Sequence, residues 1–90
     1  MNWTLNDMQE YTRHQTVERL RKRLPAGTRI VLRKMDDPQA PPIGTKGTVR
    51  GVDDMAHILV SWDNGSSLNL VYGEDRYHKL ISEEENNGDM

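Results

Sequence analysis

The chain has 90 residues, of which 34% are hydrophobic, and its formal net charge is −2 at pH 7. It contains no cysteine, which excludes disulfides, thiolate zinc sites and cysteine nucleophiles and fits a reducing compartment. Because no apolar run approaches the roughly 20 residues that cross a bilayer, and the first residues lack the pattern of a secretory signal, we expect a cytoplasmic protein that does not associate with membranes.

The first predicted element is a helix over residues 16–24. Its apolar residues Val17, Leu20 and Leu24 fall on one helical stripe, Thr16 is placed to cap its start, and Pro25-Ala26-Gly27 ends it. Residues 1–15 are interpreted as an N-terminal arm or as an extension of this helix. An extension would begin near Asn6 or Asp7 and would carry Met8 and Tyr11 on one side.

After residue 28 the apolar residues recur largely with a period of two, which predicts five short strands. The predicted ranges are 28–34, 47–53, 57–63, 67–71 and 77–81. A long irregular loop over residues 35–44 holds Pro38, Pro41 and Pro42, which remove ladder donors. Asp63-Asn64-Gly65 predicts a tight hairpin, and residues 72–75 suit a single helical turn. Residues 82–90 are predicted to form a disordered acidic tail because they offer nothing to bury.

Five short antiparallel strands with a long first loop and tight later turns predict a small, mainly β, SH3-like barrel preceded by an α-helix. The stretches TVERLRKRLPAGTRIVLRKMDDP, PPIGTKGTVRGVDD and VSWDNGSSLNLVYGEDRYHKL resemble bacterial domain of unknown function family number 4314, small proteins of phages and other mobile elements. The resemblance covers residues 16–80 and implies the same helix and SH3-like barrel. It implies no activity. The expected organisation is therefore an arm or helix extension over 1–15, one domain over 16–81, and the tail over 82–90.

No group of residues identifies a reaction. Gly44, Gly47 and Gly51 precede or lie in a strand, whereas a phosphate cradle opens a helix, so turn geometry is the better explanation for them. Pro42, Gly44 and Gly47 also fit loosely the glycine-marked turn of RNA-binding barrels of the KOW class.

The paired aspartates also do not indicate a metal site or a reaction. Asp36-Asp37 and Asp53-Asp54, the second pair with His57 nearby, lie at predicted turns, where aspartate bonds its own backbone. His14, His57 and His78 lie on different predicted elements. We therefore expect no metal ion, no cofactor and no enzymatic activity.

The leading hypothesis is a non-enzymatic interaction domain that binds a protein partner at the rim of the barrel. Trp62 shares a strand face with Ile58 and Val60 and is expected in the core, whereas Tyr72 and Tyr77 are more open. Aromatic side chains near a long loop can form a groove for a proline-rich peptide or a cage for methylated lysine. The predicted contact residues are Asp36, Asp37, Tyr72 and Tyr77. An exposed sheet edge and Trp3 are also compatible with a homodimer.

An alternative hypothesis is nucleic-acid binding. The segment from Arg13 to Lys34 is rich in arginine and lysine, with Glu18 as its acidic exception, and the predicted phosphate contacts are Arg19, Arg21, Lys22, Arg23, Arg33 and Lys34. The acidic tail would compete with the phosphates, so its deletion should tighten binding. The sequence shows no aromatic residues among these cations, which counts against stacking on single-stranded bases. The mobile-element resemblance suggests a third function, inhibition of a host defence nuclease, with the tail mimicking nucleic acid.

Overall fold

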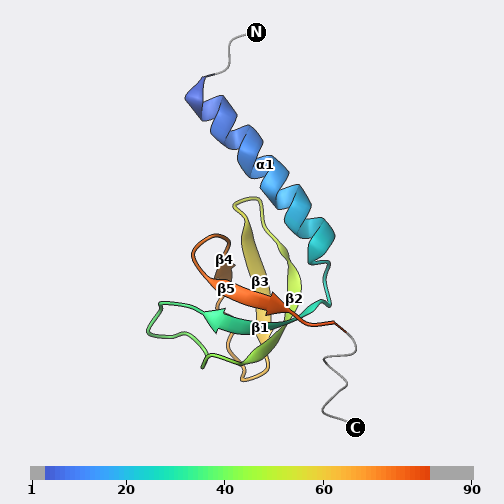
Figure 1. Ribbon diagram of the computed structural model, residues 1–90, viewed down its shortest axis with the longest axis vertical. Helices are drawn as coiled ribbons and strands as arrows, with labels where there is room; N and C mark the ends of the chain where they lie inside the picture. Colours follow the sequence, from blue (N-terminus) through green and yellow to red (C-terminus); the bar gives the residue numbers. More distant parts are fainter. Residues whose placement is uncertain (1–3, 82–90) are drawn as a thin grey trace.

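The computed structural model describes residues 4–81, so Trp3 and the tail expected over residues 82–90 lie outside the described residues. Within the described residues, one helix is followed by five strands, and Figure 1 shows how they are arranged. The helix α1 spans Leu5–Arg23, and the strands are β1 (Arg29–Lys34), β2 (Lys46–Val52), β3 (His57–Trp62), β4 (Leu70–Val71) and β5 (Arg76–Lys79).

Helix α1 begins much earlier than residue 16, in agreement with the longer of the two predicted helices. Thr4 is the N-cap and forms a capping box with Asp7, in which each side chain accepts a hydrogen bond from the backbone N–H of the other residue. Thr16 was expected to cap the helix but lies inside it, where its hydroxyl donates to the carbonyl of Thr12 at 3.1 Å. The helix ends at Arg23, and Leu24 is the C-cap.

The two halves of α1 have different surroundings. The C-terminal half packs on the sheet and buries Val17 and Leu20, joined by Leu24 after the last turn. The N-terminal half extends beyond the sheet (Figure 1), and its apolar residues Leu5, Met8 and Tyr11 are exposed. The helix is therefore anchored to the sheet at its C-terminal end.

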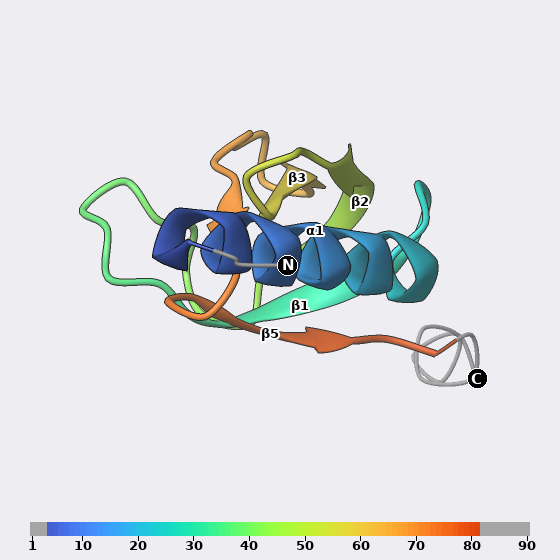
Figure 2. The same ribbon diagram turned by 90° about the horizontal axis from the view of Figure 1, so that it is seen from above.

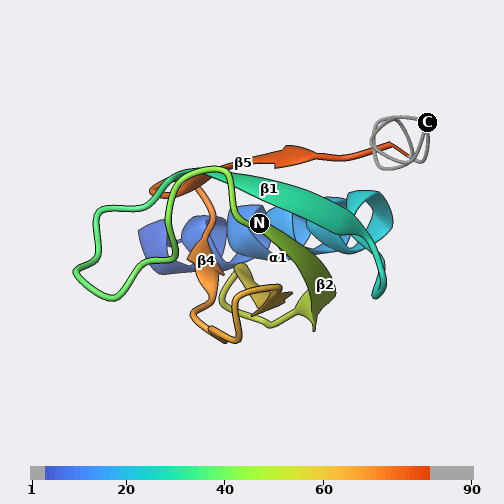
Figure 3. The same ribbon diagram turned by 90° about the horizontal axis from the view of Figure 1, so that it is seen from below.

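The five strands form one antiparallel sheet in the order β4-β3-β2-β1-β5. Seen from above and from below, β1 and β5 lie on one side of the fold and β3 on the other, so the sheet is strongly curved (Figures 2 and 3). This is the predicted mainly β fold, a small SH3-like barrel. Within residues 4–81 its two end strands, β4 and β5, do not pair with each other, which leaves the barrel open.

The strand predictions are correct in number and order, but the last two strands are shorter than expected. Residues 72–75 form a hydrogen-bonded turn in place of a helical turn: the N–H groups of Glu74 and Asp75 both donate to the carbonyl of Val71 at 3.0 Å. The Asp75 carboxylate in return accepts the N–H of Val71 at 2.7 Å. The turn that carries Tyr72 is thus tied to the end of β4.

The core lies between the curved sheet and the C-terminal half of α1. Its buried apolar side chains are Val17, Leu20, Leu24, Ile30, Leu32, Val49, Val52, Ile58, Val60, Trp62 and Leu70. Trp62 is in the core, as predicted, and its indole N–H donates to the carbonyl of Leu68 at 2.8 Å. Met35, Ala56 and Tyr77 pack against the edge of this cluster.

Candidate functional site

A groove with a volume of about 490 Å³ lies between α1 and β5. Arg19, Leu20 and Arg23 line it from the helix. Tyr77 and Lys79 line it from β5, and Tyr72 from the turn before that strand. The antiparallel pairing of β5 with β1 brings the end of the sheet beside the C-terminal half of the helix. We call this surface the α1–β5 groove.

The helix wall of the α1–β5 groove is basic. Arg19 and Arg23 are four residues apart and so lie on the same side of α1, where like charges repel each other. Within residues 4–81 neither guanidinium forms an ion pair. The opposite wall adds Lys79, whose ammonium donates to the carbonyl of Arg23 at 2.9 Å. An anion placed in the groove would therefore be attracted from both walls.

The wall opposite the helix also carries two tyrosines in different environments. Tyr77 is partly buried against the core, and this burial raises its pKa above the usual value. The positive charge of Arg23 lowers the pKa of Tyr77 in part, and the neighbouring Tyr72 raises it. Tyr77 is therefore neutral near pH 7. Tyr72 is 46% exposed and presents an accessible aromatic ring.

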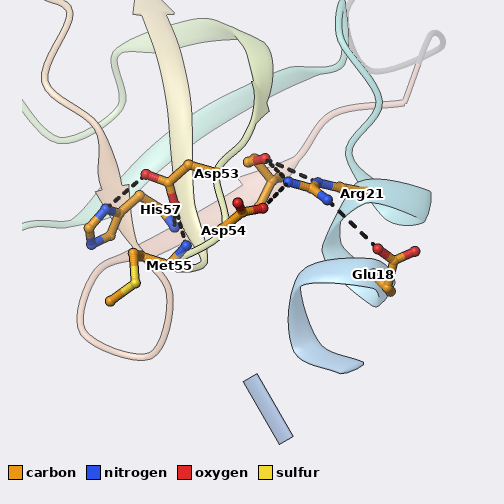
Figure 4. Close-up of polar contacts among 7 residues, drawn as sticks. Glu18, Arg21, Asp53, Asp54, Met55 and His57 are labelled. Carbon is orange, nitrogen blue, oxygen red and sulfur yellow. Dashed lines mark hydrogen bonds and ion pairs between the residues drawn. The ribbon is translucent and has the colours of Figure 1, made fainter. Parts of the chain in front are cut away.

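Arg21, predicted to contact phosphate, connects α1 to the end of β2 and to the turn between β2 and β3 (Figure 4). Its Nε and Nη2 atoms donate to the carbonyl of Val52 at 3.1 and 3.0 Å, and Nη2 also donates to the Asp54 carboxylate at 3.0 Å. Glu18 lies 3.7 Å from Nη1. These contacts explain Arg21 as a residue that positions the helix.

The same turn accounts for Asp53 and His57. The Asp53 carboxylate accepts the backbone N–H groups of Met55 at 2.9 Å and His57 at 2.8 Å, and it lies 3.1 Å from the His57 ring (Figure 4). Burial of the carboxylate opposes its ionisation, but these hydrogen bonds and the charge of His57 together hold the pKa of Asp53 below its usual value. The aspartate acts as a turn residue, as its position in the sequence predicts.

The remaining predicted cations lie outside the α1–β5 groove. Lys22 is exposed on α1, and Arg33 and Lys34 are exposed at the end of β1, where Lys34 lies 3.8 Å from Asp36. The six predicted phosphate contacts thus do not form one surface. Two of them, Arg19 and Arg23, belong to the groove.

The four predicted protein contacts are divided between two hollows. Tyr72 and Tyr77 line the α1–β5 groove. Asp36 and Asp37 line a separate hollow of about 690 Å³, together with Glu74 and Asp75. Asp37 also accepts the backbone N–H of Gln39 at 2.8 Å, so its carboxylate shapes the long loop.

Sequence reasoning did not find Lys79 or the meeting of the tyrosines with the arginines. The position of Lys79 could have been inferred from the sequence. Tyr77 and Lys79 are two residues apart in a predicted strand, and such residues point to the same side of a sheet. Their approach to Arg19 and Arg23 depends on tertiary structure.

A family model described as "Domain of unknown function (DUF4314)" matches residues 13–80. We found no match to the chain among curated proteins or among solved structures. Among the described residues, no helix is both long and apolar enough to span a membrane.

Proposed function

The chain belongs to the DUF4314 family of domains of unknown function, and we propose that it binds nucleic acid through the α1–β5 groove. The observation that carries this proposal is the meeting of two kinds of side chain in one groove. Arg19, Arg23 and Lys79 supply cations for phosphates, and Tyr72 and Tyr77 supply aromatic rings. From the sequence alone, the cations and the two tyrosines belonged to different hypotheses.

The distribution of charge supports the same proposal. All twelve lysines and arginines lie within residues 4–81, whereas Glu83, Glu84, Glu85 and Asp89 follow the last described residue. The described part of the chain thus has more basic than acidic side chains. Several of its other cations are held by carboxylates, such as Arg29 by Asp63 at 2.7 Å. The groove arginines keep their charge available for a ligand.

The test is the affinity of a fluorescein-labelled oligonucleotide, measured by anisotropy at several salt concentrations. The double variant Arg19→Gln/Arg23→Gln should bind at least about 10-fold more weakly at low salt, because two phosphate contacts are lost. The slope of log affinity against log salt should become shallower by about 1.4 for a single strand, at about 0.7 per phosphate.

The matched control is Arg33→Gln/Arg50→Gln, which removes the same charge from two exposed strand positions outside the groove. It should lower the affinity by less than about threefold. An equal loss in both double variants would show attraction to the overall charge and would contradict binding in the groove. Absence of binding by the unaltered chain at low salt would rule out the proposed function.

A second candidate function, binding of an acidic protein segment in the same groove, is favoured by the position of β5. This strand pairs with β1 and, within residues 4–81, has no partner on its other side. The N–H of Leu80 donates to the carbonyl of Arg29, and antiparallel ladders alternate. The backbone groups of Tyr77 and Lys79 therefore point away from β1, where an extended peptide could pair with them.

A peptide of alternating glutamate and valine is a suitable probe for this second function. It should shift the amide NMR signals of Tyr77 and Lys79, and the same peptide N-methylated at every residue should not, because that peptide has no backbone N–H donor on either edge. Equal shifts with both peptides, or none with either, would contradict strand addition.

A further inference from the structure

The turn that carries Tyr72 is held in place more firmly than its exposure suggests. The N–H groups of Glu74 and Asp75 donate to the carbonyl of Val71, and the Asp75 carboxylate accepts the N–H of Val71. A bridge also joins Tyr72 to Asp75, and Gly73 between them has the positive φ of 94° that the turn requires. The backbone beneath the exposed ring is thus fixed before any ligand arrives, which lowers the entropic cost of binding.

The Tyr72 ring has no evident role in the core. Tyr77 is partly buried and packs against the buried cluster, whereas Tyr72 is exposed. Tyr72 also lies across the α1–β5 groove from the arginines of the helix. Leu20, which is buried, forms an apolar part of the lining between the two walls.

This arrangement offers separate contacts to the phosphate and to the base of a nucleotide. A phosphate is suited to the helix wall, where Arg19 and Arg23 supply charge, and a base is suited to the opposite wall, where Tyr72 supplies a flat surface. Stacking of a base on an aromatic side chain requires a free face of that base. In a duplex the faces are stacked on neighbouring pairs, and only the edges are accessible in the grooves.

We propose that the α1–β5 groove selects single-stranded over duplex nucleic acid, with one unstacked base lying on the ring of Tyr72. This inference rests on the proposed function and adds the class of nucleic acid that the groove accepts. A duplex can contact the arginines but cannot stack a base on the ring of Tyr72. A single strand can do both, so the selectivity depends on Tyr72.

The experiment compares a single-stranded oligonucleotide with a duplex of the same sequence and length, by anisotropy at one salt concentration. The full chain should prefer the single strand. Tyr72→Ala should weaken single-strand binding about 10-fold, since the stacking of one base on an aromatic side chain is lost. Duplex binding should change less than twofold. Tyr72→Phe keeps the ring and should bind both ligands as the unaltered chain does.

Tyr11→Ala is the matched control, because Tyr11 is also an exposed tyrosine and lies on the part of α1 that extends beyond the sheet. It should leave single-strand binding within twofold. Circular dichroism melting curves of all three variants establish that each is folded. A duplex that binds as tightly as the single strand, or a Tyr72→Ala variant that loses affinity for both equally, overturns the inference. The proposed function survives that result if Arg19→Gln/Arg23→Gln still weakens binding, and fails with the inference if it does not.

Discussion

Gly47 occupies a position in β2 at which any side chain would collide with the core. A Cβ atom placed there would lie 2.7 Å from Cε3 of Trp62 and 2.7 Å from Cγ1 of Val60. Trp62 cannot turn away easily, because its indole N–H is bonded to the carbonyl of Leu68. Turn geometry was the expected reason for the glycines of this region, and it holds for Gly44, whose φ is 94°. At Gly47 the reason is close packing against the tryptophan ring.

Gly47→Ala is therefore predicted to lower the free energy of unfolding by about 2 kcal/mol, the usual cost of overpacking a well-packed core. Urea unfolding followed by tryptophan fluorescence measures this change. Gly51→Ala is the control, because nothing lies within 4 Å of a Cβ at that position and its φ is not positive. Gly51→Ala should change the stability by less than about 0.5 kcal/mol. Similar losses in the two variants would contradict the steric explanation.

At the scale of elements, the attachment of α1 to the sheet combines apolar burial with polar contacts, and Arg21 makes several of these contacts. Val17 and Leu20 are the buried side chains of α1. Arg21 reaches from the flank of the helix to the carbonyl of Val52, which ends β2, and to Asp54 in the following turn (Figure 4). This contact fixes the direction in which the exposed half of the helix leaves the sheet.

Arg21→Gln is expected to lower the free energy of unfolding by about 1–2 kcal/mol, since it leaves the Val52 carbonyl without its charged donor. Lys22→Gln removes the same charge from the next residue, which has no hydrogen bond or ion pair within residues 4–81. It should change the stability by less than about 0.5 kcal/mol, as measured by thermal unfolding of both variants. If the two variants lost equal stability, the charge of the helix end would be responsible and the Arg21 contact would not.

The elements themselves could be predicted to a large extent because they depend on local patterns. Alternation of apolar residues located the strands, and the hairpin signal at residues 63–65 separated β3 from β4. The start of the helix was left between two alternatives, because Thr16 and the segment near Asp7 both offer capping side chains. The reciprocal bonds of Thr4 and Asp7 decide between them, and whether both bonds form is a matter of geometry.

The groove could not be predicted, because its two walls are far apart in the sequence. Arg19 and Arg23 were assigned to one hypothesis and Tyr72 and Tyr77 to another. Only the pairing of the last strand with the first, in the order β2-β1-β5, places them around one hollow. No periodicity in either segment carries that information.

At the scale of the whole molecule, the sheet order has a consequence for how the groove behaves over time. Among residues 4–81, β5 pairs with β1 alone, and none of the β5 side chains is fully buried. Such a strand opens at a lower free energy than the strands that enclose the core. The part of the groove that β5 supplies is thus expected to open more readily than the helix wall. A ligand that touches both walls would hold the strand closed, so binding in this groove and protection of β5 amides from hydrogen exchange are two measures of the same equilibrium.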